Sequence, residues 1–395
     1  MVFTFVVDWL HLLTRWFHLV AGAAWIGASF YFVWLNNNVR PLPDDTARHA
    51  GGLWAVHGGA FYLVRKFKGA PEELPSALHW FKWEAYLTWL SGVLLLGFVY
   101  WLHPAVMMVK PSSPLSPAWA NAVGIAALPV GWLVYDLLCR SPFVHRSRLF
   151  AALGYLLIGG AAVGLHTVLS PRAAFVHLGA MLGTLMAWNV FFVIIPGQRA
   201  MVDAMSRGEP PPVQRGRAGA LRSLHNNYFT LPVLFIMVSN HFPFTYGHPV
   251  GWVVLMVLGG LGAVVKHWMN LHERGQRAPW VLPAVAVGLL ALAFVSHGPS
   301  SRAPAATGVP TLAQVKTVML KRCISCHAAK PTQPGILEAP KGFRLDVPER
   351  WPEQSALIYQ QAVLTEAMPL GNLTGMTREE RALLGAWIDA GSPLD

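Results

Sequence analysis

Eight apolar runs, each about 20 residues long, constrain this chain more than any other feature. A run of this length crosses the ~30 Å hydrocarbon core of a bilayer as a helix, because a helix satisfies its own backbone hydrogen bonds. The composition, 54% hydrophobic and 12% charged, is too apolar for a soluble protein. We therefore expect an all-α fold, a polytopic membrane bundle of eight helices at approximately 9–35, 82–102, 118–139, 148–169, 173–196, 221–241, 249–271 and 279–297.

The basic residues between these runs predict the orientation of the chain. One set of alternate loops holds sixteen Lys or Arg residues, and the other set holds Lys110 and Arg172. The basic set comprises segments 36–82, 140–148, 197–222 and 272–278. Basic loops stay in the cytoplasm, so an even number of spans puts both termini on the periplasmic side of a bacterial inner membrane. The net charge of +11 is explained by this topology, and we expect no nucleic-acid partner.

A different signal follows the last run, where Cys323-Ile324-Ser325-Cys326-His327 forms a C-x-x-C-H sequence. Two cysteines at this spacing form thioethers to a porphyrin, and the adjacent histidine binds the iron, so the motif predicts one covalent haem c. Met368, 41 residues after His327 in a loop containing Pro and Gly, is the expected second axial ligand. A His/Met pair raises the reduction potential of the iron. Haem c is attached outside the cytoplasmic membrane, which agrees with the predicted topology.

Composition also predicts the domain boundaries. Segment 299–309 is rich in Pro, Ser and Ala, as a flexible linker is. It would separate an integral membrane domain, 1–298, from a cytochrome c domain, 310–395. Thr311 and Thr377 each precede a sequence typical of a helix start, so we expect a small two-helix frame around the haem.

Polar side chains inside the apolar runs fall into two layers. Such groups are costly in lipid and are functional candidates, although each histidine can instead be an interfacial or packing residue. The layer nearer the periplasm contains Asp8, His11, Arg15, His18, His166, His177 and His241. The layer nearer the cytoplasm contains His57, Glu84, Arg222, His225, Asn226, Asn227, Lys266 and His267.

Seven segments carry a resemblance to a known family: 16–27, 53–59, 79–86, 189–198, 224–232, 239–243 and 367–376. They closely resemble the bacterial membrane-bound cytochrome c urate oxidase (urate hydroxylase) family. The resemblance covers essentially the whole chain, with both modules in the same order. It implies oxidation of urate to 5-hydroxyisourate, with electrons passing to the fused haem c. A soluble or membrane cytochrome c or a terminal oxidase would then accept the electrons, without release of peroxide.

The turn from Arg222 to Asn227 is the expected site for a planar purine anion. The guanidinium of Arg222 has the geometry to clamp urate oxygens, because its fork matches planar acceptors. Asn226 and Asn227 offer amide donors and acceptors to the ring edge.

The remaining roles fall to three other residues of the same layer. Urate oxidation needs a base for a ring N–H, and His225 and Glu84 are alternative candidates for it. His267 is expected to hold the water that adds to the oxidised ring.

The distance between this layer and the haem leaves two alternatives. A cytoplasmic site and a periplasmic haem c lie on opposite sides of a ~30 Å core, which is too far for direct electron transfer. Either urate binds in the periplasmic layer or a relay lies between. The first span is similar to small membrane proteins that bind haem b or copper through a histidine at the place of His18. His18, His166 and His177 are therefore the candidate ligands of a second haem, haem b.

A non-enzymatic function is the competing hypothesis. The chain would then be a membrane electron-transfer subunit that passes electrons from quinol or a partner dehydrogenase to a soluble cytochrome. Urate would leave haem c oxidised in such a subunit.

The loop charges give a direct test of topology. Tags at both termini should be accessible to protease from the periplasmic side of spheroplasts, because the basic loops retain the other side in the cytoplasm. Protection of a C-terminal tag would contradict the topology and the assignment of residues to layers.

Overall fold

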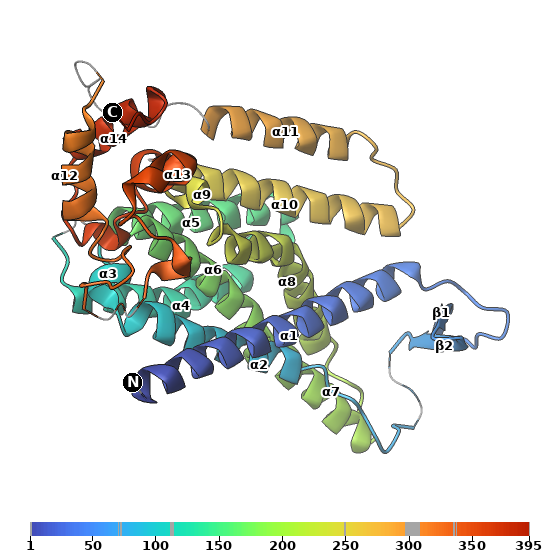
Figure 1. Cartoon of the computed structure of the whole chain (residues 1–395). Coiled ribbons are helices and arrows are strands. Elements are labelled where there is room, and N and C mark those ends of the chain that lie inside the picture. The colour runs from blue at the N-terminus through green and yellow to red at the C-terminus, as the bar shows by residue number, and fades with distance from the viewer. Residues whose placement is uncertain are drawn as a thin grey trace.

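A computed structural model of the chain describes residues 2–69, 71, 73–110, 114–248, 250–296, 309–334, 336 and 338–394. The described part is mostly helical, with one β-hairpin (Figure 1). The strands are β1 (His49–His57) and β2 (Ala60–Phe67). The helices are α1 (Val2–Asn38), α2 (Trp83–Leu96), α3 (Pro104–Met107), α4 (Pro117–Arg140), α5 (Ser147–Val168), α6 (Pro171–Asn189), α7 (Ile195–Ser206), α8 (Val213–Ser239), α9 (Pro243–Tyr246), α10 (Gly251–Glu273), α11 (Val281–Ser296), α12 (Leu312–Arg322), α13 (Trp351–Ile358) and α14 (Arg378–Asp389).

Within the described residues, six helices are long and apolar enough to cross a membrane. They are Val6–Asn38, Trp83–Trp101, Pro117–Arg140, Ser147–Val168, Pro171–Ser206 and Gly251–Glu273. Two of the eight expected spans fall short of this criterion, for different reasons. Helix α8 is 27 residues long but carries several Arg and Asn residues, and α11 is apolar but has only 16 residues.

One span boundary and one loop differ from the sequence prediction. The fifth span continues to Ser206 through a π-helical segment, Val190–Ile194. Pro196 explains the widening, since it has no N–H to donate back along the helix.

The hairpin is the second difference, because the sequence predicted an all-α fold with a loop at 36–82. Strands β1 and β2 pair in an antiparallel register around Gly58 and Gly59, which both have positive φ. Such a turn matches the twist of a hairpin. His57 is the last residue of β1, so its assignment to an intramembrane polar layer was wrong.

Helix α6 forms the centre of the bundle, because most of its side chains are buried against α2, α4, α5 and α8. It begins at Ser170-Pro171, where the serine side chain accepts a hydrogen bond from the N–H of Ala173. Glycines permit close helix packing here: a Cβ at Gly124 of α4 would lie 2.7 Å from the His177 ring. This helix therefore positions the polar residues that its neighbours present.

The C-terminal helices form a second core. Both expected capping boxes are present, Thr311 with Gln314 at the start of α12 and Thr377 with Glu380 at the start of α14. The core contains Val315, Val318, Met319, Leu345, Trp351, Ile358, Met376, Leu384 and Trp387. The expected linker, 299–309, lies outside the described residues except for Val309.

The C-terminal helices lie at the end of the bundle where α1 begins, and the hairpin lies at the other end (Figure 1). Residues 365–371, here called the Met368 loop, pack against α3 and α9. A Cβ added to Gly371 would lie 2.6 Å from the carbonyl oxygen of Val106, and one added to Gly247 would lie 2.6 Å from that of Thr365. The loop that holds Met368 is therefore in direct contact with the helix bundle.

Substitution of Gly371 tests this contact. Gly371→Ala should separate the Met368 loop from α3, since its φ is +58° and its Cβ would collide with Val106. Gly391→Ala is the control, because Gly391 also has positive φ (+89°) but open space around it. Hydrogen exchange at α3 should rise in the first variant alone; equal exchange in both would contradict the contact.

Candidate functional site

A buried group of polar side chains connects α4, α6 and α8, and we call it the arginine cluster: Tyr135, Asp136, Asn189, Arg222, His225 and Asn226. Its centre is an ion pair in which the Arg222 guanidinium donates to Asp136 Oδ1 at 2.5 Å. Arg222 also donates to Asn189 Oδ1 at 3.3 Å, and its guanidinium lies 4.8 Å from the Tyr135 ring centroid. A second guanidinium, that of Arg140, contacts Asp136 Oδ2 at 2.7 Å.

Amide and hydroxyl groups complete the arginine cluster. Asn189 Nδ2 donates to the Tyr135 hydroxyl at 3.1 Å and to Asn226 Oδ1 at 2.9 Å. Asn226 Nδ2 in turn donates to the Met186 carbonyl at 2.9 Å. The Tyr135 hydroxyl lies 2.8 Å from His225 Nδ1. The polar groups of this cluster thus largely satisfy one another, as buried polar groups must to avoid a desolvation cost.

The other expected cytoplasmic-layer residues lie apart from this cluster. Asn227 points to α10, where its Oδ1 accepts a hydrogen bond from Asn270 Nδ2 at 3.1 Å. His267 is exposed and lies 2.7 Å from the Tyr228 hydroxyl. Glu84 is in the first turn of α2, and its Oε2 is buried without a partner among the described residues. The structure therefore brings together Arg222, His225 and Asn226 of the expected set.

The periplasmic-layer histidines have separate environments. His177 is fully buried, with Nδ1 2.8 Å from the Ala173 carbonyl and Nε2 accepting from the Trp101 indole at 3.1 Å. Both of its ring nitrogens are engaged, which does not fit an iron ligand. His166 lies in the last turns of α5. The described residues contain no group of three or more His, Cys, Asp or Glu placed to hold a metal ion.

His18 differs, because only its Nδ1 is engaged, 3.0 Å from both the Thr88 carbonyl and the Ser91 hydroxyl. Donation from Nδ1 to the carbonyl leaves Nε2 as the nitrogen that can bind iron. Gly92 gives the ring space, since a Cβ there would lie 3.1 Å from His18 Cε1. An open, apolar hollow of about 380 Å³ lies beside it, lined by Leu13, Thr14, Phe17, Leu87, Leu90, Ser91 and Leu94.

The C-x-x-C-H turn follows α12 directly and has the features that a covalent haem needs. His327 Nδ1 lies 2.8 Å from the Phe343 carbonyl, and donation to that oxygen leaves Nε2 for iron. Cys323 and Cys326 are free thiols, and burial raises the pKa of Cys323 to about 12. Arg381 fixes the backbone near the second ligand, donating to the Met368 carbonyl at 2.7 Å. The residues present therefore fit a haem c.

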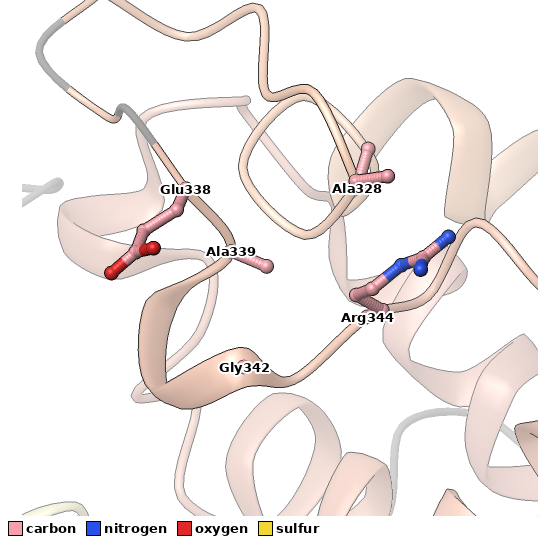
Figure 2. A pocket seen from close by; sticks show the side chains of 6 residues that line it. Ala328, Glu338, Ala339, Gly342 and Arg344 are labelled. Atoms are coloured by element: carbon pink, nitrogen blue, oxygen red, sulfur yellow. The ribbon is translucent and has the colours of Figure 1, made fainter.

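A shallow pocket of about 390 Å³ opens beside this turn, lined by Ala328, Ala329, Glu338, Ala339, Gly342 and Arg344. Figure 2 shows the Glu338 and Arg344 side chains extending away from each other, on opposite sides of the pocket. Arg344 instead pairs with Asp346, which also accepts from the Ala329 N–H at 2.9 Å. These hydrogen bonds lower the pKa of Asp346 to about 2. The pocket thus presents no converging charges, and Asp346 connects its rim to the residues that follow the C-x-x-C-H turn.

The architecture defines a class: a bundle of apolar helices, long enough to cross a membrane, followed by a small helical segment with a C-x-x-C-H turn. The sequence model of the Urate oxidase N-terminal family matches residues 4–297, more than half of the chain, so the chain belongs to that family. The family suggests an oxidoreductase that acts on urate. Searches of curated proteins and of solved structures gave no match.

Sequence reasoning missed three residues of the arginine cluster, namely Tyr135, Asp136 and Asn189. Asp136 is an ionisable residue within an apolar run, so the criterion that singled out Arg222 applies to it equally. Asn189 and Tyr135 carry no comparable signal, because neutral polar side chains are common at helix contacts.

Removal of one partner of the central ion pair should destabilise the bundle. Asp136→Leu would leave Arg222 as a buried charge whose carboxylate partner is gone, at a cost of about 3–5 kcal/mol. The double variant Asp136→Leu/Arg222→Met should recover most of that loss, since no charge then remains unpaired. Thermal unfolding in detergent measures both. A double variant as unstable as the single one would contradict a structural role for the pair.

Proposed function

We propose that the helix bundle oxidises urate to 5-hydroxyisourate and that the electrons pass to a haem c on the same chain. Urate and water give 5-hydroxyisourate, two protons and two electrons. A soluble or membrane cytochrome c or a terminal oxidase of the inner membrane takes the electrons, and no peroxide is released. The observation that carries this proposal is the family match over residues 4–297, followed on the same chain by a C-x-x-C-H turn.

The C-terminal residues supply the electron-accepting part of the proposal. A haem c held here would supply a one-electron acceptor for the bundle. Cys323 and Cys326 would hold its porphyrin, and His327 and Met368 its iron. The hydrogen bond from His327 Nδ1 to the Phe343 carbonyl orients the ring and raises the basicity of Nε2.

The contact of the Met368 loop with α3 and α9 supports transfer from the bundle to this haem. Gly371 lies against Val106, and Gly247 lies against Thr365, close enough that a Cβ at either glycine would be 2.6 Å from a carbonyl oxygen. The loop that carries the proposed axial ligand Met368 therefore lies directly against the bundle.

The polar residues of α8 support a urate site in the cytoplasmic half, with His225 or Glu84 as the base. A site there needs a relay to the periplasmic end, and His18 is the residue whose contacts leave Nε2 available. Its contact residue Ser91 also lines the apolar hollow. A haem b at this place would bridge the distance. His177 is withdrawn from the proposed ligand set, because Trp101 and Ala173 occupy its ring nitrogens.

The decisive experiment adds urate to the purified protein without oxygen. We expect each urate that is oxidised to reduce two equivalents of haem c, and no peroxide to accumulate when air and an electron acceptor are supplied. Met368→Ala serves as the matched variant: it should retain the attached haem but lower its reduction potential, since a Met ligand raises it.

The same experiment tests the competing hypothesis of an electron-transfer subunit. Haem c that stays oxidised with urate but is reduced by a quinol would identify an electron-transfer subunit and would refute the proposed oxidation.

A further inference from the structure

Lys266 of α10 is fully buried, with 0% of its surface exposed, and its Nζ has no hydrogen-bond partner among the described residues. The ammonium lies 3.8 Å from the ring centroid of Phe30 on α1. Glu273, the carboxylate that acts on it electrostatically, lies seven residues further along α10 and accepts a hydrogen bond from Asn37. A buried ammonium in this situation is costly, because the aromatic ring alone replaces little of its hydration.

Two amides close to Lys266 are also incompletely satisfied. Asn270 is one helical turn away on α10, and its Nδ2 donates to Asn227 Oδ1 at 3.1 Å. Asn227 Nδ2 and Asn270 Oδ1 are buried without partners. We call Asn227, Lys266 and Asn270 the lysine cluster. Three of its polar atoms are thus available to a ligand, whereas buried polar groups are ordinarily paired.

The available atoms define the chemistry of that ligand. The Lys266 ammonium and the Asn227 amide are donors, and Asn270 Oδ1 is an acceptor. A ligand that satisfies all three carries a negative charge and a carbonyl oxygen beside a ring N–H. Urate has this pattern, because its ring edges alternate oxygens with N–H groups and it is an anion at neutral pH.

The arginine cluster offers no equivalent set. Arg222 is neutralised by Asp136 and hydrogen bonded to Asn189. A substrate that took the Arg222 guanidinium would have to break the ion pair and leave Asp136 with Arg140, which is largely exposed. Of these two buried cations, Lys266 is the one without a carboxylate in contact among the described residues.

There is also open space on one face of α6. A Cβ added to Gly183, which is itself partly exposed, would meet no atom within 4 Å. Gly183 is seven residues before Val190 and shares its face of the helix, which packs toward Trp25 of α1 and Ala85 of α2. Helix α1 packs against α10 and α8 as well, so this face borders the helices that carry the lysine cluster.

We propose that the lysine cluster binds urate, with the Lys266 ammonium on a charged oxygen, Asn227 Nδ2 on a neighbouring acceptor and Asn270 Oδ1 on a ring N–H. This inference rests on the proposed urate oxidation and reassigns the oxygen clamp from Arg222 to Lys266. The arginine cluster then fixes α8, whose next residue, Asn227, contacts the substrate.

Lys266→Met tests the assignment, with Lys82→Met as the control. Lys82 also lies on an aromatic ring, 5.6 Å from that of Trp83, but at the start of α2. Equilibrium binding of radiolabelled urate to the haem-loaded protein should weaken about tenfold or more in Lys266→Met and stay unchanged in Lys82→Met, because a charge-assisted hydrogen bond is lost. The unfolding temperature of Lys266→Met without urate should be unchanged or higher, since a costly buried charge is removed.

The outcomes separate this inference from the proposed oxidation. Wild-type protein that binds urate without reducing haem c would refute the oxidation and leave the binding test valid. Unchanged urate affinity in Lys266→Met would overturn the lysine cluster as the site while the oxidation stands, and absence of urate binding by the wild-type protein would overturn both. Should Lys266→Met not fold, Lys266→Gln replaces it with the same expected loss of affinity.

Discussion

The carboxylate of Asp136 is the group on which the interior of the bundle depends. It holds two guanidinium groups, one buried and one exposed, and thereby connects α4 to α8 across the end of α6. In an apolar surrounding, such a pair is stable only if its remaining polar atoms are also satisfied. Asn189 meets this need, since its amide group contacts Arg222, Tyr135 and Asn226 together.

The two polar clusters on α8 differ in whether their side-chain polar atoms are paired with one another. Asn226 and Asn227 are adjacent in sequence, yet Asn226 belongs to a closed network and Asn227 to a group with unpaired atoms. Burial without partners costs free energy, so each such group needs an explanation, and contact with a ligand is one. This contrast is the reason for proposing that urate binds at Lys266 and that Arg222 has a structural function.

The C-terminal helices add a second constraint, that of distance. The Met368 loop contacts α3 and α9 at the end of the bundle where α1 begins. Lys266 and Asn270 lie in the last third of α10, toward its C-terminal end. A proposed electron path must therefore run along the bundle, and His18 in the first half of α1 is the histidine whose contacts suit an intermediate position.

Sequence by itself determined the apolar helices, both capping boxes of the C-terminal helices, and the C-x-x-C-H turn, because each depends on residues close together along the chain. The hairpin of β1 and β2, whose strands are joined by a turn of two glycines, was not predicted. The position of His57 within that hairpin was therefore also wrong. Side-chain partners were decided by tertiary structure alone. Arg222 and Asp136 are 86 residues apart and Asn227 and Asn270 are 43 apart, so no local pattern distinguishes the paired guanidinium from the unpaired ammonium of Lys266. Only the packing of α1, α4, α6, α8 and α10 brings Asp136 into contact with Arg222 and leaves the Lys266 ammonium without a hydrogen-bond partner among the described residues.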